Sequence, residues 1–390
     1  MSRLVFRHLF EIFIKIDCDA TKKYLGTIIA TLICKNRRNV MIRKLLLLIA
    51  LVIVASCAKP KTPVSPSESN QLKIVSSCKL IGNPIDLTVD DSIIYVAEDQ
   101  AGYALINTKN NILIYENNSI SNVKLYKTQK LAVNASENEV FIYDNKGSSH
   151  RSNIYVADIS NPQNPLLIST ISDSTMNVTN LYAVDNNESN SGEYPTIIYW
   201  INWNIIHDVF NLNKGYFSKQ NKYFATSFEL PTFTPKSFTM DSNNLYIASN
   251  QLGIDIVNKD DAHRISLVNT PGEALAVIRY ENLLYVADRQ AGLQVIDVTD
   301  IQNPILLNDF AFDTIGYAQS LDIDSENNLL SVASGGGGVY VFHLNYPKKP
   351  ELIGRLDSSQ IGYTNITKIH KGKVLIGSRE NGIVKISTED

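Results

Sequence analysis

Cysteine is scarce in this sequence, as are tryptophan, histidine and methionine. The 390 residues include four Cys, two Trp, six His and four Met. Only one cysteine, Cys78, lies in the long part of the chain after residue 57, so that part cannot form an intramolecular disulfide. It must be stabilised by its hydrophobic core, which some 300 residues can supply. The histidines show no pair at metal-ligand spacing, which argues against a zinc site.

Long hydrophobic runs are also rare, and the clearest one lies near the N-terminus. Met41–Ser56 begins with Arg43 and Lys44 and continues as an apolar run of about ten residues. Such a run is too short to span roughly 30 Å of hydrocarbon as a permanent helix, but it fits a secretory signal peptide. Residues 41–56 are therefore predicted to be a cleaved signal.

The residues that end this run carry a more specific signal. Val54-Ala55-Ser56-Cys57 resembles the lipobox of bacterial lipoproteins. The resemblance implies that the chain is cut before Cys57 and that the Cys57 thiol is diacylated. The alternative is a buried apolar strand that happens to end in Cys. Residues 1–40 lack signal architecture and are interpreted as an extension from a mis-called start codon, with an amphipathic cytoplasmic extension as the alternative.

A flexible tether is predicted next. Residues 57–71 contain Pro60, Pro63 and Pro66 at three-residue spacing among small polar residues. A chain of this kind extends by about 3.1 Å per residue, so it could hold a domain up to roughly 40 Å from the lipid. The expected location is the cell envelope, lipid-anchored, at the outer membrane on its periplasmic side or on the cell surface.

The sequence carries no excess of basic residues over acidic ones. The formal charge is −3, and residues 1–56 hold ten of the basic and three of the acidic residues, which leaves about −10 for the rest. Nucleic-acid binding requires a basic footprint, so nucleic acid is not an expected partner.

An internal repeat is the main feature of residues 72–390. In the clearest unit, Glu273–Leu307, four strand-like runs are separated by turn residues. Seven units recur 39 to 58 residues apart, with Tyr285 matched by Tyr95, Phe141, Tyr199, Tyr246, Ser331 and Leu375. In five units a glycine stands seven residues after this anchor, where a hairpin requires a positive φ. These glycines are Gly102, Gly253, Gly292, Gly338 and Gly382.

Around Gly292-Leu-Gln-Val-Ile-Asp-Val the sequence resembles the LVIVD repeat family of bacterial secreted proteins. The resemblance implies a β-propeller and implies little about activity. The period near 46 residues, with four strands per unit, independently predicts an all-β, seven-bladed β-propeller of four-stranded antiparallel blades. The last unit has only three strands, and Leu72–Ile81 is an orphan strand that resembles the missing fourth. We therefore predict that this N-terminal strand closes the ring.

Candidate binding residues lie in the loops that lead into the innermost strands. Glu273, Tyr317 and Tyr363 occupy matching positions after a glycine, and Asn83 lies in the equivalent loop at Gly82-Asn83-Pro84. Aromatic faces beside a carboxylate could hold a sugar, a peptide or a cation at the channel mouth. The alternative is that the tyrosines pack between blades.

Trp200 and Trp203 fall in the most divergent unit. They could form an exposed recognition patch, or they could fill space between neighbouring blades.

The leading functional hypothesis is an envelope-anchored binding or scaffolding module for a protein, a peptide or a glycan, acting as a monomer. The alternative is a propeller enzyme, lactonase-like or glycan-cleaving, that uses channel-facing acids. No catalytic residue set, metal site or cofactor motif is predicted. Gly335–Gly338 resembles a phosphate loop, but it lies between two strands without a following helix, and so it predicts a hairpin.

Overall fold

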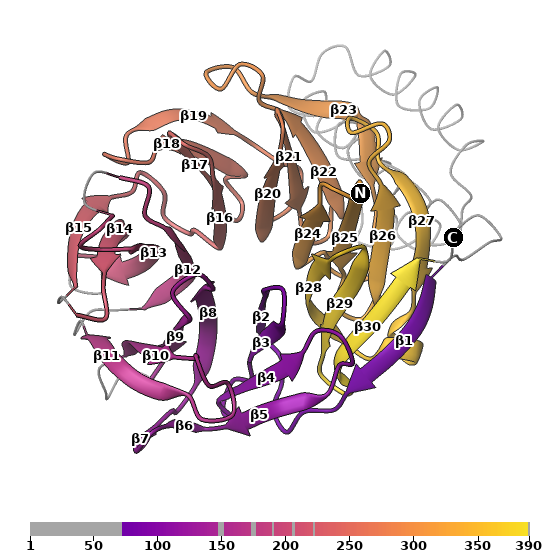
Figure 1. The fold of residues 1–390 in the computed structure, drawn as a ribbon. Helices are drawn as coiled ribbons and strands as arrows, with labels where there is room; N and C mark the ends of the chain where they lie inside the picture. The colour runs from indigo at the N-terminus through magenta and orange to yellow at the C-terminus, as the bar shows by residue number, and fades with distance from the viewer. Residues whose placement is uncertain are drawn as a thin grey trace, which may run out of the picture. The chain divides into compact units, whose positions relative to one another are not determined.

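The chain forms a closed ring of β-sheets (Figure 1). The computed structural model describes residues 72–146, 152–172, 177–188, 191–204, 207–220 and 223–388. Within these residues the strands form seven four-stranded antiparallel sheets and one two-stranded sheet. The predicted all-β, seven-bladed propeller is confirmed. Cys57, the signal peptide and the tether lie outside the described residues.

Six blades are built from four strands in sequence order, the first of them innermost in the ring (Figure 1). The first two blades are β2 (Asp86–Val89), β3 (Ile93–Ala97), β4 (Tyr103–Asn107) and β5 (Leu113–Asn117), then β8 (Thr128–Asn134), β9 (Glu139–Asp144), β10 (Asn153–Asp158) and β11 (Leu166–Ser172). The third and fourth are β12 (Val178–Asp185), β13 (Thr196–Asn204), β14 (Val209–Phe217) and β15 (Phe224–Glu229), then β16 (Ser237–Met240), β17 (Asn244–Ala248), β18 (Ile254–Asn258) and β19 (Arg264–Val268). The fifth and sixth are β20 (Ala276–Tyr280), β21 (Leu283–Ala287), β22 (Leu293–Asp297) and β23 (Ile305–Phe312), then β24 (Ser320–Asp324), β25 (Leu329–Ala333), β26 (Val339–His343) and β27 (Glu351–Leu356).

The seventh blade joins the two ends of the described chain. It consists of β28 (Thr364–His370), β29 (Lys373–Ser378), β30 (Gly382–Thr388) and β1 (Leu72–Cys78), in that order. Strand β1 runs antiparallel to β30, from Leu72 opposite Thr388 to Cys78 opposite Ile383. Figure 1 shows this first strand on the outside of the last blade. The predicted closure by the N-terminal strand is confirmed, and the ring needs no open edge at this point.

The repeat anchor marks the second strand of every blade. Its seven residues are all buried, including Tyr95 in β3 and Tyr285 in β21. All five predicted hairpin glycines have positive φ, from +67° at Gly382 to +95° at Gly102. The repeat therefore fixes both the buried side of the second strand and the turn that follows it.

A second recurring position links neighbouring blades. Four residues after the anchor stand Asp99, Asn250, Arg289 and Gly335, all with positive φ. Each forms an isolated bridge to the loop or strand start of the next blade. In one of them the Asn250 N–H donates to the Ala274 carbonyl (3.1 Å), and the Ala274 N–H donates back (2.9 Å). These bridges fix the loops at the channel mouth relative to the preceding hairpins.

Two short elements interrupt the regular pattern. Strands β6 (Ser119–Ile120) and β7 (Val123–Lys124) form a small hairpin between the first two blades. The helical turn α4 (Ser358–Ile361) is capped by Asp357, whose carboxylate accepts from the Ser359 N–H. Among the described residues no helix is long and apolar enough to cross a membrane.

Candidate functional site

Within the described residues, loops from successive blades lie on one face of the ring. In antiparallel sheets the connection into each first strand and the hairpin between the second and third strands lie at the same end. The inter-blade bridges join these two kinds of loop directly. We call this the cleft face, and we call the other face the opposite face. The exposed apolar side chains of Ile81, Phe233, Ile315 and Tyr317 all belong to loops of the cleft face.

A cleft of about 470 Å³ opens at the channel mouth on this face. Its lining includes Glu273, Tyr317 and Tyr363, three of the four residues that the sequence predicted to meet there. The Glu273 carboxylate pairs with the Arg289 guanidinium at 2.5 Å, and this guanidinium lies 5.1 Å from the centre of the Tyr317 ring. Tyr317 is 50% exposed, so it does not pack between blades. We call this site the channel-mouth cleft.

Tyr363 lines the same cleft from the loop before β28. Its hydroxyl accepts a hydrogen bond from the Gln319 amide (2.7 Å), and the Arg379 guanidinium lies 4.7 Å from its ring centre. The Tyr363 N–H donates to Glu380 (2.6 Å). A half-buried ring held by two side-chain contacts, on a backbone that is itself hydrogen-bonded, presents a defined surface, which reduces the side-chain entropy lost when a ligand binds.

Asn83 lies on the same face but apart from this cleft. Its amide oxygen accepts a hydrogen bond from the Asn365 amide (2.7 Å), which links the loop before β2 to β28. Asn83 is not among the residues that line the channel-mouth cleft. The structure therefore places it beside the closure of the ring, where it joins the first and last blades.

The two tryptophans have different environments. Trp200 is 3% exposed and packs with Phe141 and Tyr143 in the core between the second and third blades. Trp200 therefore cannot belong to an exposed recognition patch, and inter-blade packing accounts for it. Trp203 is half-buried, and its indole N–H donates to Asp208 at 3.1 Å within the hairpin that joins β13 and β14.

Buried carboxyl groups fasten the loops of the cleft face. Asp288 accepts from the Thr270 hydroxyl (2.7 Å) and from the Gly272 N–H (2.8 Å), and burial raises its pKa. At the equivalent place in the first blade, Glu98 accepts from the Gly82 N–H (2.9 Å). Burial raises the pKa of Glu98 to about 8, and the nearby Glu116 carboxyl adds a smaller contribution in the same direction. These acids hold the loop backbone and do not line the cleft.

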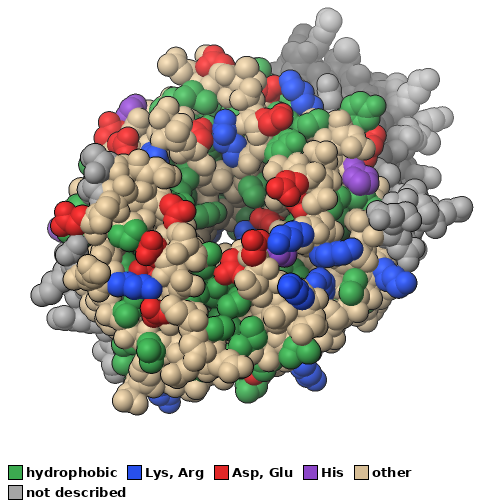
Figure 2. All heavy atoms as spheres, viewed as in Figure 1, with side chains coloured by type: hydrophobic (Ala, Val, Ile, Leu, Met, Phe, Trp, Pro, Cys, Tyr) green, Lys and Arg blue, Asp and Glu red, His purple; other side chains and the backbone are tan. Residues whose placement is uncertain are grey.

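Acids also lie on the innermost strands, and two of them form ion pairs with lysines. Asp322 on β24 contacts the Lys368 ammonium (3.0 Å) and accepts from the Ile369 N–H (2.7 Å). Asp86 on β2 contacts Lys130 (3.8 Å) and accepts from the Leu131 N–H (2.9 Å). Both pairs join neighbouring blades. Figure 2 shows acidic and basic side chains together around the central opening. No cluster of metal-ligating side chains occurs in the part of the chain that the structure describes.

The sequence did not predict several of the residues that line the channel-mouth cleft. Lys236, Asn250, Arg289 and Gln319 also line the channel-mouth cleft. Asn250 and Arg289 occupy the recurring position four residues after the anchor, in the same hairpin as the glycine. Aligning the units on that position would have placed both side chains at the channel mouth beside Glu273.

Comparisons with known proteins support the fold and one repeat. Residues 271–311, which include β20–β22 and most of β23, match the family model of the LVIVD repeat. No curated protein matches the chain in sequence. Among solved structures, the computationally designed Ika8 protein is similar with a TM-score of 0.54 and 10% identity, covering 80% of this chain and 99% of that one.

Two further solved structures have higher TM-scores. The Cps50 (Swd1) β-propeller domain of Myceliophthora thermophila has a TM-score of 0.60 and 9% identity, covering 81% of this chain and 99% of that one. U3-55K has a TM-score of 0.60 and 9% identity, covering 83% of this chain and 100% of that one. At such identities the similarity concerns the fold alone. The chain is a seven-bladed β-propeller that carries an LVIVD repeat in its fifth blade.

Proposed function

We propose that this protein is a lipid-anchored binding module of the bacterial cell envelope, and that its channel-mouth cleft holds a peptide segment of another envelope protein. The observation that carries the proposal is the composition of the cleft and its surroundings. The exposed Tyr317 ring stands beside an Arg289–Glu273 pair, with amide side chains around it. Tyrosine and arginine are the residue types that most often dominate protein interfaces.

Apolar side chains around the cleft favour a protein ligand over a small polar one. Phe233 and Ile315 are exposed in loops of the same face. Exposed apolar groups rimmed by polar ones are typical of protein interaction surfaces. Lys236 adds a positive charge to the lining, which suits a carboxylate on the bound segment.

The position of the first strand supports a tether on the far side. Cys78 lies beside Gly382, which follows a hairpin of the cleft face, whereas Leu72 pairs with Thr388 at the other end of β30. A tether that leads into Leu72 would therefore reach the domain at the opposite face. Attachment of a tether at Leu72 would leave the loops of the channel-mouth cleft free to contact a partner.

The anchor is tested by replacing the thiol that lipidation requires. We expect Cys57→Ser to move the protein from the membrane fraction to the soluble fraction and to abolish incorporation of labelled palmitate. The measurement is membrane fractionation together with metabolic labelling of both proteins. Unchanged palmitate incorporation in Cys57→Ser would contradict the lipid anchor.

The cleft is tested by replacing its most exposed aromatic residue. We expect Tyr317→Ala to weaken co-purification of the bound envelope protein about tenfold or more, because tyrosine is enriched at interface hot spots, where truncation to alanine costs about 2 kcal/mol or more. Thermal unfolding should change little, since the ring is half exposed. Tyr346 is a matched control, because it is 66% exposed and follows β26 on the opposite face. Loss of the partner in Tyr346→Ala and its retention in Tyr317→Ala would refute the proposal.

A further inference from the structure

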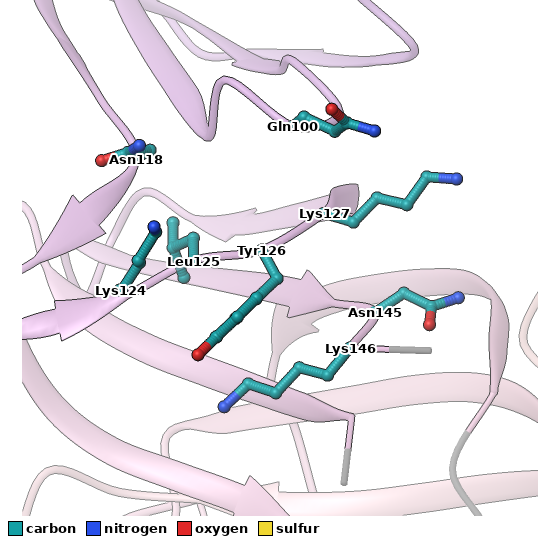
Figure 3. Close-up of a pocket in the computed structure, with 8 residues that line it drawn as sticks. All are labelled: Gln100, Asn118, Lys124, Leu125, Tyr126, Lys127, Asn145 and Lys146. Carbon is teal, nitrogen blue, oxygen red and sulfur yellow. The ribbon is translucent and has the colours of Figure 1, made fainter. Parts of the chain in front are cut away.

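A second cleft lies on the cleft face, between the first and second blades. It has a volume of about 430 Å³ and is lined by Lys124 at the end of β7 and by residues that follow β3, β5, β7 and β9. Three lysines, Lys124, Lys127 and Lys146, surround Tyr126, which is 49% exposed. In Figure 3 the Tyr126 ring lies between Lys124 and Lys146, and Lys127 extends on the side of Gln100. We call this site the lysine groove.

The lysine groove is a concentration of positive charge in an acidic domain. The Lys124 and Lys146 ammonium groups lie 6.0 Å and 5.3 Å from the centre of the Tyr126 ring. Within the described residues neither lysine forms a direct ion pair with an acidic side chain, although the Lys146 charge acts on the buried Asp144 carboxyl, and Lys127 pairs with Asp99 at 3.7 Å. A bound anion would stabilise ammonium groups that lie near one aromatic ring.

Several backbone N–H groups in the groove already donate hydrogen bonds within the protein. One Asp144 oxygen accepts from the N–H groups of Tyr126 (2.8 Å) and Lys127 (2.7 Å). The Leu125 N–H donates to Asn118, and the Asn145 N–H donates to Lys127. A peptide that binds by extending main-chain pairing would find none of these donors available. The groove therefore offers side chains rather than a strand edge.

The polar side chains of the groove suit hydroxyl groups. Gln100 and Asn118 line it beside the lysines, and each amide can both donate and accept. A sugar hydroxyl also donates and accepts, whereas a carboxylate only accepts. A ligand that carries carboxylates and many hydroxyls matches both kinds of group on one surface.

We propose that the lysine groove binds an acidic oligosaccharide. Lys124, Lys127 and Lys146 pair with its carboxylates, the Tyr126 ring contacts a sugar ring, and the Gln100 and Asn118 amides bind its hydroxyls. The site is separate from the channel-mouth cleft and does not depend on the function proposed for that cleft.

The test is calorimetric titration of the full chain in detergent with oligogalacturonate, with its methyl ester, and with poly-glutamate of matched length. We expect oligogalacturonate to bind, and the uncharged ester to bind at least about tenfold more weakly. The double variant Lys124→Gln/Lys146→Gln should weaken oligogalacturonate binding about tenfold or more. The control Lys109→Gln/Lys349→Gln removes the same charge from two exposed lysines on loops of the opposite face, and it should leave binding within about twofold.

Four outcomes would overturn the proposal. These are no binding of oligogalacturonate, equal binding of the ester, an equal loss in the control variant, and tighter binding of poly-glutamate, which would assign the groove to an acidic peptide. Tyr317→Ala should retain oligogalacturonate binding. A failure at the channel-mouth cleft is therefore distinguishable from a failure at the lysine groove.

Discussion

A chain that starts at Pro84 is expected to aggregate or to unfold, whereas one that starts at Ser69 is expected to be soluble and monomeric. The difference is strand β1, which supplies the fourth strand of the last blade. Leu72 packs with Val384, Ile386 and Leu356 in one core cluster, and Cys78 packs with Ile383 in the next. Without β1 these side chains and the edge of β30 would be exposed.

The expected size of this effect follows from the buried side chains. Burying one large apolar side chain contributes about 1.5–3 kcal/mol, and a whole domain is stable by only about 5–15 kcal/mol. The loss of several such contacts therefore approaches the net stability of the domain. Size-exclusion chromatography and thermal unfolding of the two chains measure the difference. Cooperative melting of both at the same temperature would contradict closure by β1.

Gly338→Ala is expected to lower the free energy of unfolding by roughly 2–4 kcal/mol, because a side chain at this position is strained and has no space. Gly338 has φ +83°, and an added Cβ would lie 2.0 Å from the Leu356 carbonyl oxygen on the neighbouring strand. Either the hairpin or the pairing of β26 with β27 must shift. Urea denaturation followed by circular dichroism measures the change.

Gly336 provides a matched control in the same hairpin. A Cβ at Gly336 meets no atom within 4 Å, and its φ is not positive. Gly336→Ala should therefore change the free energy of unfolding by less than about 0.5 kcal/mol. Equal destabilisation by both substitutions would show that the hairpin tolerates no side chain at all, and that the repeat glycine has no special conformational role.

The fold was predictable because its signals are local and repeated. The buried anchor at Tyr285 and the glycine at Gly292 recur at fixed spacing, and both report the conformation of their own hairpin. Ring closure was predictable for a related reason, since an incomplete last unit and an orphan first strand complement each other. Less regular parts, such as β6 and β7, depend on a single insertion that no repeat signals.

The candidate sites were predictable only in part. Glu273, Tyr317 and Tyr363 share one position in the repeat. Because the ring places equivalent loops of successive blades on the same face, these residues line one cleft at the channel mouth. Arg289 reaches Tyr317 in the loop that leads into the next blade, and this contact depends on how two blades pack rather than on spacing in the sequence. The burial of Trp200 depends on packing in the same way, because both tryptophans lie on β13 but only Trp200 packs in the core between two blades.

Photo-crosslinking in intact cells tests most directly whether the cleft face is the binding face. A photo-crosslinking amino acid in place of Tyr317 should form a discrete adduct with one envelope protein, and the adduct should disappear when Tyr363→Ala is added. The same amino acid in place of Tyr346, on the opposite face, should form no such adduct. An adduct from position 346 and none from position 317 would contradict the account, because it would place the binding surface on the face assigned to the tether.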